Sequence, residues 1–364
     1  MASSTTMRPA RRVAHHLVCC QQRRSLTVSA PRRSQQLTAK DAADRMMSDF
    51  GGKSVTRRQL IDGNQLQKLA LTLGRPQLGG PGGLDVSEAA PPAGTPVPPG
   101  YHLVYFTPDG VEAQLGADGT DRSFNAPSPF SRRMWAGGVM RWPGAAADSS
   151  SKNSPVLRVG DMAEERTRLI SATAKKSRSA GEMVLVEVEK EFWTPRGLAL
   201  VDQRSWIFRP ELDPNAQMEP PKTLLNANTR APTEITDLAD EKNGNGPARQ
   251  FRWSPTGLFR FSALTFNGHK IHYNEEWTQR VEAHPGLVVH GPLNLINMLD
   301  YWRDVHGAGR IPHSISYRAM SPVYAGETYL VRTEGSDDTG EGKIWDVLVD
   351  KNGVVCMKGQ VLSK

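Results

Sequence analysis

The sequence predicts an α+β fold in which antiparallel strands wrap around one buried helix. First, residues 291–307 carry a broad apolar face with Pro292 in the first turn, which predicts a well-buried helix. Second, the segments after it are strand-like, at 311–320, 328–333, 344–349 and 354–361. Third, residues 350–353 end in Asn-Gly, which predicts a hairpin between the last two strands. One buried helix followed by antiparallel strands is typical of a sheet that wraps around a helix.

The middle of the chain predicts a further block of strands. Apolar and polar residues alternate from Val184 to Phe192, and a second β-rich run covers residues 198–208. A short turn with Pro and Gly at 195–197 separates the two runs, which predicts a long antiparallel hairpin. Residues 101–106 are apolar and aromatic, and we interpret them as a strand or a rigid entry segment.

Changes in composition mark the boundaries between these blocks. Apolar residues from Leu66 to Leu73 recur at helical spacing and stop at Gly74, which predicts a short amphipathic helix. Residues 76–100 are rich in Gly and Pro, and 210–250 combine several Pro with a polar run, so both are predicted linkers. The predicted order is a leader at 1–40, a helix and linker at 41–100, a first block at 101–210, a linker at 211–250 and a second block at 251–364.

The charge of the chain is unevenly distributed. The 364 residues carry a formal net charge of +7, but residues 1–40 hold eight basic residues and no Asp or Glu. The basic and acidic residues of 41–364 nearly balance, which gives no electrostatic footprint for a nucleic-acid partner. An Arg- and Ser-rich, acid-free leader has the composition of a mitochondrial transit peptide, so we expect the mitochondrial matrix as the location. A basic tail without a targeting role is the alternative.

Other locations are disfavoured by what the sequence lacks. The leader has no apolar core of the length that a secretory signal needs. No stretch is long and apolar enough for a membrane span, so we expect no membrane partner. Cys356 is the one cysteine outside the leader, which excludes an intrachain disulfide in the body and a Cys-based zinc site. We interpret it as a small core residue of a strand.

Candidate chemistry is concentrated in two stretches of the second block. Residues 260–273 contain Asn267, His269 and His272, and residues 285–291 end in His290 and Gly291 at the start of the buried helix. Histidine is the usual general acid or base at neutral pH. The N–H groups of a helix N-terminus can hold negative charge that develops on an oxygen. The pair therefore suits proton transfer next to a carbonyl.

Two other interpretations of the three histidines remain open at this point. They are compatible with a metal site, although no carboxylate or Cys stands at a convincing ligand spacing. They are also compatible with buried histidines that serve only as hydrogen-bonded core residues.

The same two stretches resemble the hydratase motif of the MaoC-like dehydratases, which have a hot-dog fold. That motif reads Gly-Asp-x-Asn-Pro-Ile-His and is followed by an apolar run that ends in His-Gly at the central helix. Here Asn267 takes the Asp position, His269 the Asn position and His272 the His position, while His290 and Gly291 begin the helix.

Residues 101–364 as a whole resemble the fungal double hot-dog hydratases. These are the mitochondrial hydroxyacyl-thioester dehydratases of type 2 and the mesaconyl-C4-CoA or itaconyl-CoA hydratases. The stretch from Ser262 to Tyr273 and the stretch from Pro285 to Pro292 are the most specific, and residues 118–121 and 132–138 also match. The resemblance implies a tandem hot-dog whose first half is non-catalytic and widens the acyl tunnel.

The resemblance also implies the roles of single residues. His272, alone or with His269, carries the proton transfer, and the Gly291 N–H next to His290 binds the thioester oxygen. Arg132 and Arg133 meet the phosphates of CoA or of phosphopantetheine, or else are solvated surface arginines. One departure matters: Asn267 replaces the family's Asp and cannot take up a proton. We expect Asn267 to orient the water or the 3-hydroxyl group, and a catalytically inactive homologue is the competing interpretation.

The leading hypothesis is a mitochondrial lyase that removes water from 3-hydroxyacyl thioesters, or adds it to enoyl thioesters, in fatty acid synthesis. It needs no cofactor or metal, because the substrate arrives as a CoA or acyl-carrier-protein thioester. Hydration of a short branched dicarboxylyl-CoA is the alternative within the same chemistry. A thioesterase with Glu275 or Glu276 as its carboxylate, and a non-catalytic acyl-carrier binding protein, are the other classes. The chain is expected to be a monomer or a homodimer.

Overall fold

A computed structural model describes residues 37–80, 82–144, 151, 153–178, 181–212, 231–239 and 246–364. The predicted transit peptide lies outside the described residues, apart from its last four positions. The last two of them already belong to the first helix, α1 (Ala39–Phe50), which Thr38 caps through its side chain. Residues from Leu37 to Lys364 form one compact unit.

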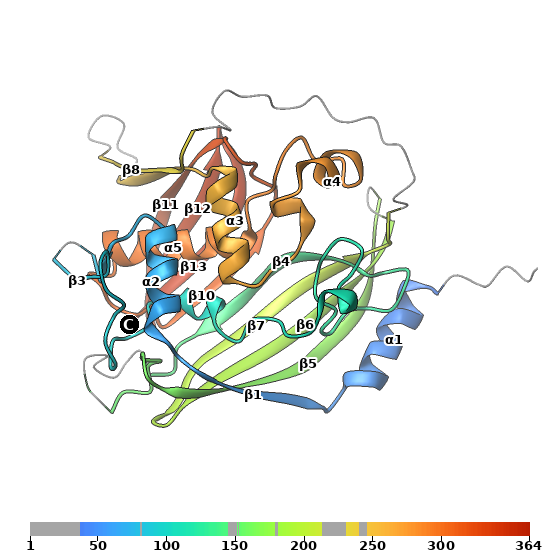
Figure 1. The fold of residues 1–364 in the computed structure, drawn as a ribbon, viewed down its shortest axis with the longest axis horizontal. Helices are drawn as coiled ribbons and strands as arrows, with labels where there is room; N and C mark the ends of the chain where they lie inside the picture. The colour runs from blue at the N-terminus through green and yellow to red at the C-terminus, as the bar shows by residue number, and fades with distance from the viewer. Residues whose placement is uncertain are drawn as a thin grey trace, which may run out of the picture. The chain divides into compact units, whose positions relative to one another are not determined.

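An eleven-stranded antiparallel sheet runs through this unit (Figure 1) in the order β1-β5-β6-β7-β4-β10-β13-β12-β11-β9-β8. The first half contributes β1 (Ser54–Leu60), β4 (Arg132–Arg141), β5 (Met162–Ser177), β6 (Gly181–Thr194) and β7 (Gly197–Arg209). The second half contributes β8 (Glu234–Leu238), β9 (Ala248–Arg252), β10 (Ser314–Ala319), β11 (Thr328–Thr339), β12 (Gly342–Lys351) and β13 (Val354–Ser363). Antiparallel pairing of β4 with β10, in which Gly138 lies opposite Tyr317, joins the two halves into one sheet.

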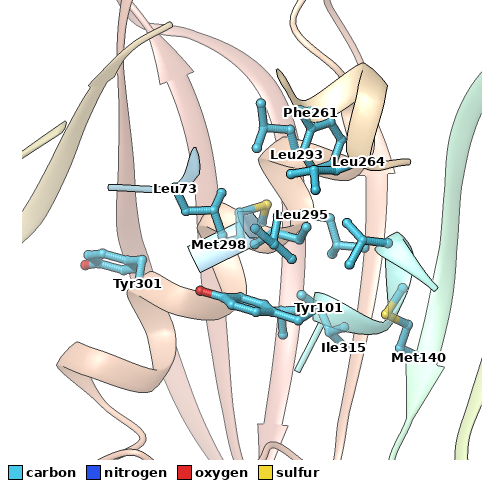
Figure 2. Packing of buried hydrophobic residues seen from close by; sticks show 14 of the residues in the cluster. Leu73, Tyr101, Met140, Phe261, Leu264, Leu293, Leu295, Met298, Tyr301 and Ile315 are labelled. Atoms are coloured by element: carbon cyan, nitrogen blue, oxygen red, sulfur yellow. The ribbon is translucent and has the colours of Figure 1, made fainter. Parts of the chain in front are cut away.

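The long helix of the second half, α5 (Gly291–Val305), is buried along most of its length. Pro292 occupies its first turn, as the sequence predicts, where the missing N–H costs no hydrogen bond. Leu293, Leu295 and Met298 are fully buried and pack with Phe261 and Leu264 of α3 (Pro255–Leu264), as Figure 2 shows. The same cluster includes buried residues of α2 (Gly63–Thr72) and of the sheet, so this helix organises the main core.

The first half has a smaller core of its own. The short helix α1 packs on β5 and β6, and its buried residues are Ala39, Ala42, Ala43 and Met46. They join a cluster with Val184, Val186 and Val188 of β6 and with Phe208 of β7. The fold is therefore α+β, with helices on an antiparallel sheet in each half, and the longest buried helix lies in the second half.

Short elements complete the described structure: β2 (Gln77–Leu78), β3 (Leu84–Asp85), η1 (Tyr101–Val104), η2 (Glu112–Gln114), η4 (Lys270–His272) and α4 (Glu275–Arg280). Among the residues described, no helix is both long enough and apolar enough to cross a membrane.

Several predicted elements are confirmed. The helix predicted at residues 66–73 is α2, and Leu66, Leu69 and Ala70 form its buried face. The runs on either side of residues 195–197 are β6 and β7, which pair in antiparallel fashion from Val184 to Thr194 of β6. The turn between β12 and β13 places Asn352 at φ 52° and Gly353 at φ 82°. Both values lie in the left-handed region, which is what an Asn-Gly hairpin turn supplies. Cys356 is buried in β13.

Three segments differ from the prediction. Of the two interpretations of residues 101–106, the strand is wrong: residues 101–104 form a turn of 3₁₀ helix, in which Tyr101 enters the core and its hydroxyl donates to Asp300 of α5 at 2.9 Å. The sheet begins at β1, inside the segment predicted at 41–100 as a helix and a linker. Strand β8 and the start of β9 lie inside the linker predicted at 211–250. Strands β1 and β8 are the two edges of the sheet and are largely exposed, so they carry almost no apolar pattern for sequence analysis to detect.

Candidate active site

A cavity of about 1170 Å³ lies between the two halves of the sheet and is lined by residues from both. It holds every site residue that the sequence predicts: Asn267, His269, His272, His290, Gly291, Arg132 and Arg133. Residues that are far apart in the sequence thus line the same cavity. The histidines come from the second half, and the arginines come from β4.

His272 is held in one orientation by backbone contacts. It ends the turn η4, and its Nδ1 lies 2.7 Å from the carbonyl oxygen of Val288. A carbonyl can only accept, so Nδ1 carries the proton and Nε2 keeps its lone pair. The Val288 N–H in turn donates to the Ile271 carbonyl at 2.9 Å, which fixes the two segments together. The neutral His272 therefore offers Nε2 as a base.

His290 packs directly against that base. The two imidazole rings stack with centroids 3.6 Å apart and planes 17° apart. His290 is the residue before α5, and its Nε2 lies 2.9 Å from Ser262 Oγ, a serine of α3. His269 contacts the other side of the group, with its ring 5.4 Å from that of His272 at nearly right angles. The three histidines predicted from sequence thus form one cluster.

Burial keeps this cluster uncharged at neutral pH. The desolvation of both rings lowers the pKa of His269 and of His272 to about 3. Nearby Arg133 and Arg132 lower the pKa of His269 further, and His269 does the same for His272. The pKa of His290 is also well below its usual value, because the ring is buried beside His272. All three imidazoles are neutral in the free protein.

Gly291 supplies a hydrogen-bond donor beside the cluster. It is the first residue of α5, where an N–H has no intrahelical acceptor. Pro292 has no N–H at all, so Gly291 is the donor that the helix start presents next to His290. A Cβ on residue 291 would lie 2.2 Å from Trp135 Cε3, so only glycine lets the indole cover this point. The helix dipole adds partial positive charge there.

Asn267 can offer its amide group to a substrate. Its Oδ1 accepts from the backbone N–H of His269 at 3.0 Å. Its Nδ2 amide can only donate. Asn267 is thus suited to contact an oxygen that carries lone pairs, such as a hydroxyl or water oxygen.

Asp118 is a carboxylate near the cluster that the sequence analysis did not select as a site residue. Its Oδ2 lies 3.7 Å from His269 Nε2, and its backbone carbonyl accepts from the Lys270 N–H at 2.8 Å. The Nε2 of His269 is buried and has no hydrogen-bond partner within the part of the chain that the structure describes. Asp118 comes from the first half, and the resemblance of residues 118–121 to the family was the one signal that pointed to it.

Arg132 and Arg133 line the cavity, but each already holds a carboxylate. Arg132 donates to Glu282 through Nε at 2.7 Å and through Nη2. Arg133 donates to Asp121 and stacks over the ring of Trp206 at 4.8 Å. Both arginines are mostly buried, with side chains 18% and 14% exposed, so neither is a solvated surface residue.

The two glutamates considered for a thioesterase lie elsewhere. Glu275 and Glu276 are on α4 and exposed, and Glu276 pairs with Arg280 at 3.0 Å. Neither is among the residues that line the cavity. Within the residues described, no group of three or more His, Cys, Asp or Glu side chains has the arrangement to hold a metal ion.

Comparisons with known proteins agree with this architecture. A MaoC-like dehydratase from Phytophthora capsici superimposes with a TM-score of 0.55 at 13% identity, over 88% of this chain and 98% of its own. The Mycobacterium tuberculosis protein HtdX superimposes with a TM-score of 0.52 at 14% identity, over 86% of this chain and 100% of its own. At such identities the likeness concerns the fold alone.

Sequence comparison gives the family. A mesaconyl-C(4)-CoA hydratase from Chloroflexus aurantiacus is 32% identical over 243 residues, which cover 66% of this chain and 76% of that protein. A mitochondrial hydroxyacyl-thioester dehydratase type 2 from Schizosaccharomyces pombe is 28% identical over 243 residues, covering 64% and 76%. The model of the hydroxyacyl-thioester dehydratase type 2 family matches residues 100–325. The chain therefore belongs to the hydroxyacyl-thioester dehydratase type 2 family.

Proposed function

We propose that this protein is a hydro-lyase that interconverts 3-hydroxyacyl and 2-enoyl thioesters in the mitochondrial matrix, with fatty acid synthesis as its pathway. The observation that carries the proposal is the neutral His272, whose Nε2 makes no hydrogen bond to the described residues, in the same cavity as the N–H of Gly291. The two named relatives are a hydratase and a dehydratase, and one of them is called mitochondrial.

Dehydration then proceeds with the residues in separate roles. His272 Nε2 takes the proton from Cα, and the electrons of the broken C–H bond move onto the thioester oxygen, which the Gly291 N–H stabilises. The bond between Cβ and the hydroxyl oxygen breaks next, and the leaving hydroxyl takes the proton back from the His272 imidazolium. Water and the enoyl thioester are the products, and His272 is neutral again. Hydration is the reverse sequence.

The neighbouring residues position these groups. Asn267 donates from Nδ2 to the hydroxyl or water oxygen, which orients it without exchanging a proton. His290 holds the ring of His272 in place by stacking against it. Asp118 is a positioning residue that acts through His269, since it does not line the cavity. Arg132 binds the phosphates of CoA or of phosphopantetheine through the guanidinium N–H groups that do not donate to Glu282.

A thioesterase is disfavoured by the state of the carboxylates in the cavity. Three carboxylates that line it, Glu282, Asp121 and Glu165, are each paired with at least one cation, and a fourth, Asp109, is exposed. A carboxylate that is engaged by a cation is not free to orient and deprotonate an attacking water. The second candidate is a hydratase of short dicarboxylyl-CoA thioesters, which is favoured by the cationic side chains Arg57, Lys190 and Arg204 on the first-half wall of the cavity.

The test uses the purified full-length chain with crotonyl-CoA, mesaconyl-CoA and longer 2-enoyl-CoA thioesters. We expect the enoyl absorbance to fall while no free thiol is released. Release of thiol from substrates that keep their enoyl absorbance would show a thioesterase instead. If neither signal changes with any substrate, the protein is not an enzyme of this class and the acyl-carrier binding alternative takes its place.

A further inference from the structure

A band of charged side chains crosses the inner face of the first-half sheet. Arg57 on β1 lies opposite Glu165 on β5, and Lys190 on β6 lies opposite Asp202 on β7. Arg204 follows on the same face of β7, two residues after Asp202. On both sides of this band the same face carries buried apolar residues such as Val188 and Phe192, so charges here are unusual. Each buried ion costs several kcal/mol in lost hydration unless it is paired.

The ion pairs within this band leave one more positive charge than negative charge. Glu165 accepts from Lys190 Nζ at 3.0 Å and from Arg57 Nη2 at 2.8 Å. Asp202 pairs with Arg204, with Nη2 2.6 Å from Oδ2. His102 lies 3.3 Å from Asp202, but its burial lowers its pKa and keeps it neutral. Three cations therefore face two carboxylates.

The surplus charge faces the cavity. Arg57, Lys190 and Arg204 all line it, whereas Asp202 is fully buried behind them. Lys190 is the most affected: burial, with Arg204 nearby, lowers its pKa to about 8 although Glu165 is its partner. Desolvation is the main cause and the charge of Arg204 adds to it, so a further anion beside Lys190 would stabilise its charged form.

The hydroxyl group of Tyr317 is a neutral hydrogen-bond donor beside these cations. Its ring lies across β4, where a Cβ on Gly138 would come within 2.6 Å of the Tyr317 hydroxyl. Gly138 lies opposite Arg204 in the sheet, so the hydroxyl reaches the cationic end of the band. The side chain is 5% exposed, and its hydroxyl has no hydrogen-bond partner among the residues that the structure describes. A buried hydroxyl without a partner is costly unless a ligand completes it.

The same tyrosine connects this place to the reaction centre. Tyr317 stacks on Trp135 with ring centroids 4.9 Å apart, and Trp135 covers Gly291. The wall of the cavity thus runs without a break from the Gly291 N–H, past Trp135 and Tyr317, to the cations. An acyl group that starts at Gly291 and follows this wall arrives at Arg204 and Lys190.

We propose that Lys190, Arg204 and Tyr317 form a subsite for a carboxylate at the far end of the acyl group. The inference rests on the proposed hydro-lyase chemistry and specifies its substrate class as ω-carboxyl-2-enoyl thioesters. It therefore favours the dicarboxylyl-CoA candidate over fatty acid synthesis, whose acyl chains end in a methyl group. A carboxylate there makes the numbers of buried cations and anions equal and accepts the hydrogen bond of the Tyr317 hydroxyl. The first half then selects the substrate, and the second half performs the reaction.

The test compares pairs of 2-enoyl-CoA thioesters of matched length, one with a terminal carboxylate and one with a terminal methyl group. The readout is the ratio of kcat/KM for the two members of a pair. Lys190→Met and Tyr317→Phe are the two variants, because Glu165 keeps Arg57 as a partner in the first and no existing hydrogen bond is lost in the second. Arg168→Met is the matched control, since Arg168 is an exposed residue of β5 that pairs with Glu189 of β6 and does not line the cavity.

At one length or more we expect the carboxylate to raise kcat/KM in the unmodified protein. Each variant then lowers the ratio about tenfold or more, as expected for loss of a hydrogen bond to a charged group. Arg168→Met leaves the ratio unchanged. The proposal is overturned if no length favours the carboxylate, or if both variants retain the preference. Hydration of the methyl-terminated member reports the proposed function separately, so the two can fail independently.

The phosphates of CoA are the other source of negative charge for this subsite. If they bind there, the variants weaken both members of each pair equally and the ratio stays constant, which also contradicts the proposal. Repeating the comparison with N-acetylcysteamine thioesters, which have no phosphate, removes that source. A ratio that still falls in Lys190→Met with these thioesters supports the carboxylate subsite.

Discussion

The two ends of the cavity solve the problem of buried polar groups in opposite ways. At the second-half end, His269, His272 and His290 lose their charge, because burial lowers the pKa of each. At the first-half end, Lys190 and Arg204 keep carboxylate partners, and burial is offset by ion pairs. A neutral imidazole can accept a proton from a substrate, whereas a protonated cation is suited to bind an anion. The contrast separates chemistry from recognition within one cavity.

The largest effect is expected at the proton-transferring end. His272→Ala removes the Nε2 base and should lower kcat about 10²- to 10⁴-fold on every substrate, since general acid–base catalysis contributes that much. His306→Gln is the matched control, because His306 packs on Trp345 and does not line the cavity. Steady-state hydration of crotonyl-CoA measures both variants. Unchanged kcat in His272→Ala would remove His272 from the mechanism.

The next effect concerns the donor at the start of α5. Gly291→Ala places a Cβ 2.2 Å from Trp135 Cε3, so the indole or the helix start has to move. We expect kcat to fall about 10²-fold, the size of the loss of an oxyanion donor. In the double variant with Trp135→Leu the clash is gone, and part of the activity should return. A double variant no more active than Gly291→Ala would show that the clash is not the cause.

A smaller effect should appear in the pH dependence of folding. The folded pKa of His290 is lowered, while the unfolded chain binds a proton near pH 6.5. Below that pH the unfolded state holds more protons, so stability is complete above pH 6.5 and declines as the pH falls. His290→Gln should reduce the slope of unfolding free energy between pH 6 and 5 by up to about 1.4 kcal/mol per pH unit. Urea unfolding at several pH values gives the slope, and an identical slope in both proteins contradicts the assignment.

The smallest effect is an expected absence of change. Because the pKa of His272 is about 3 in the free protein, the base is already deprotonated throughout the neutral range. The kcat/KM for crotonyl-CoA should therefore show no inflection near pH 6.5, the value of an unperturbed histidine. A clear inflection there would mean that the cavity hydrates the imidazoles more than their burial indicates.

The sequence predicted the second half better than the first. The helix at 291–305 and the strands after it carry complete apolar patterns, because their residues face a core on at least one side. Strand β1 has a polar sequence because it is an exposed edge, so its place in the sheet depends on pairing with β5, which no local pattern encodes. Tyr101 resembled a strand residue but enters the core next to Asp300.

The site divides in the same way. His272, His290 and Gly291 were found because they are close in the sequence and match a family motif. Lys190 and Arg204 are single polar residues in long strands, and they come together only through the register of β6 and β7. The partner of Arg132, Glu282, lies 150 positions away, and no spacing rule connects the two.

The pairing of β4 with β10 has a consequence for how such a cavity can change. Where two identical subunits meet about a two-fold axis, any substitution is made twice, once on each side. Here the two sides are different stretches of one polypeptide, so a replacement alters a single position. One wall can acquire a charge without placing the same charge beside the imidazoles. The covalent link also makes assembly of the cavity independent of protein concentration, because the two sides can never dilute apart.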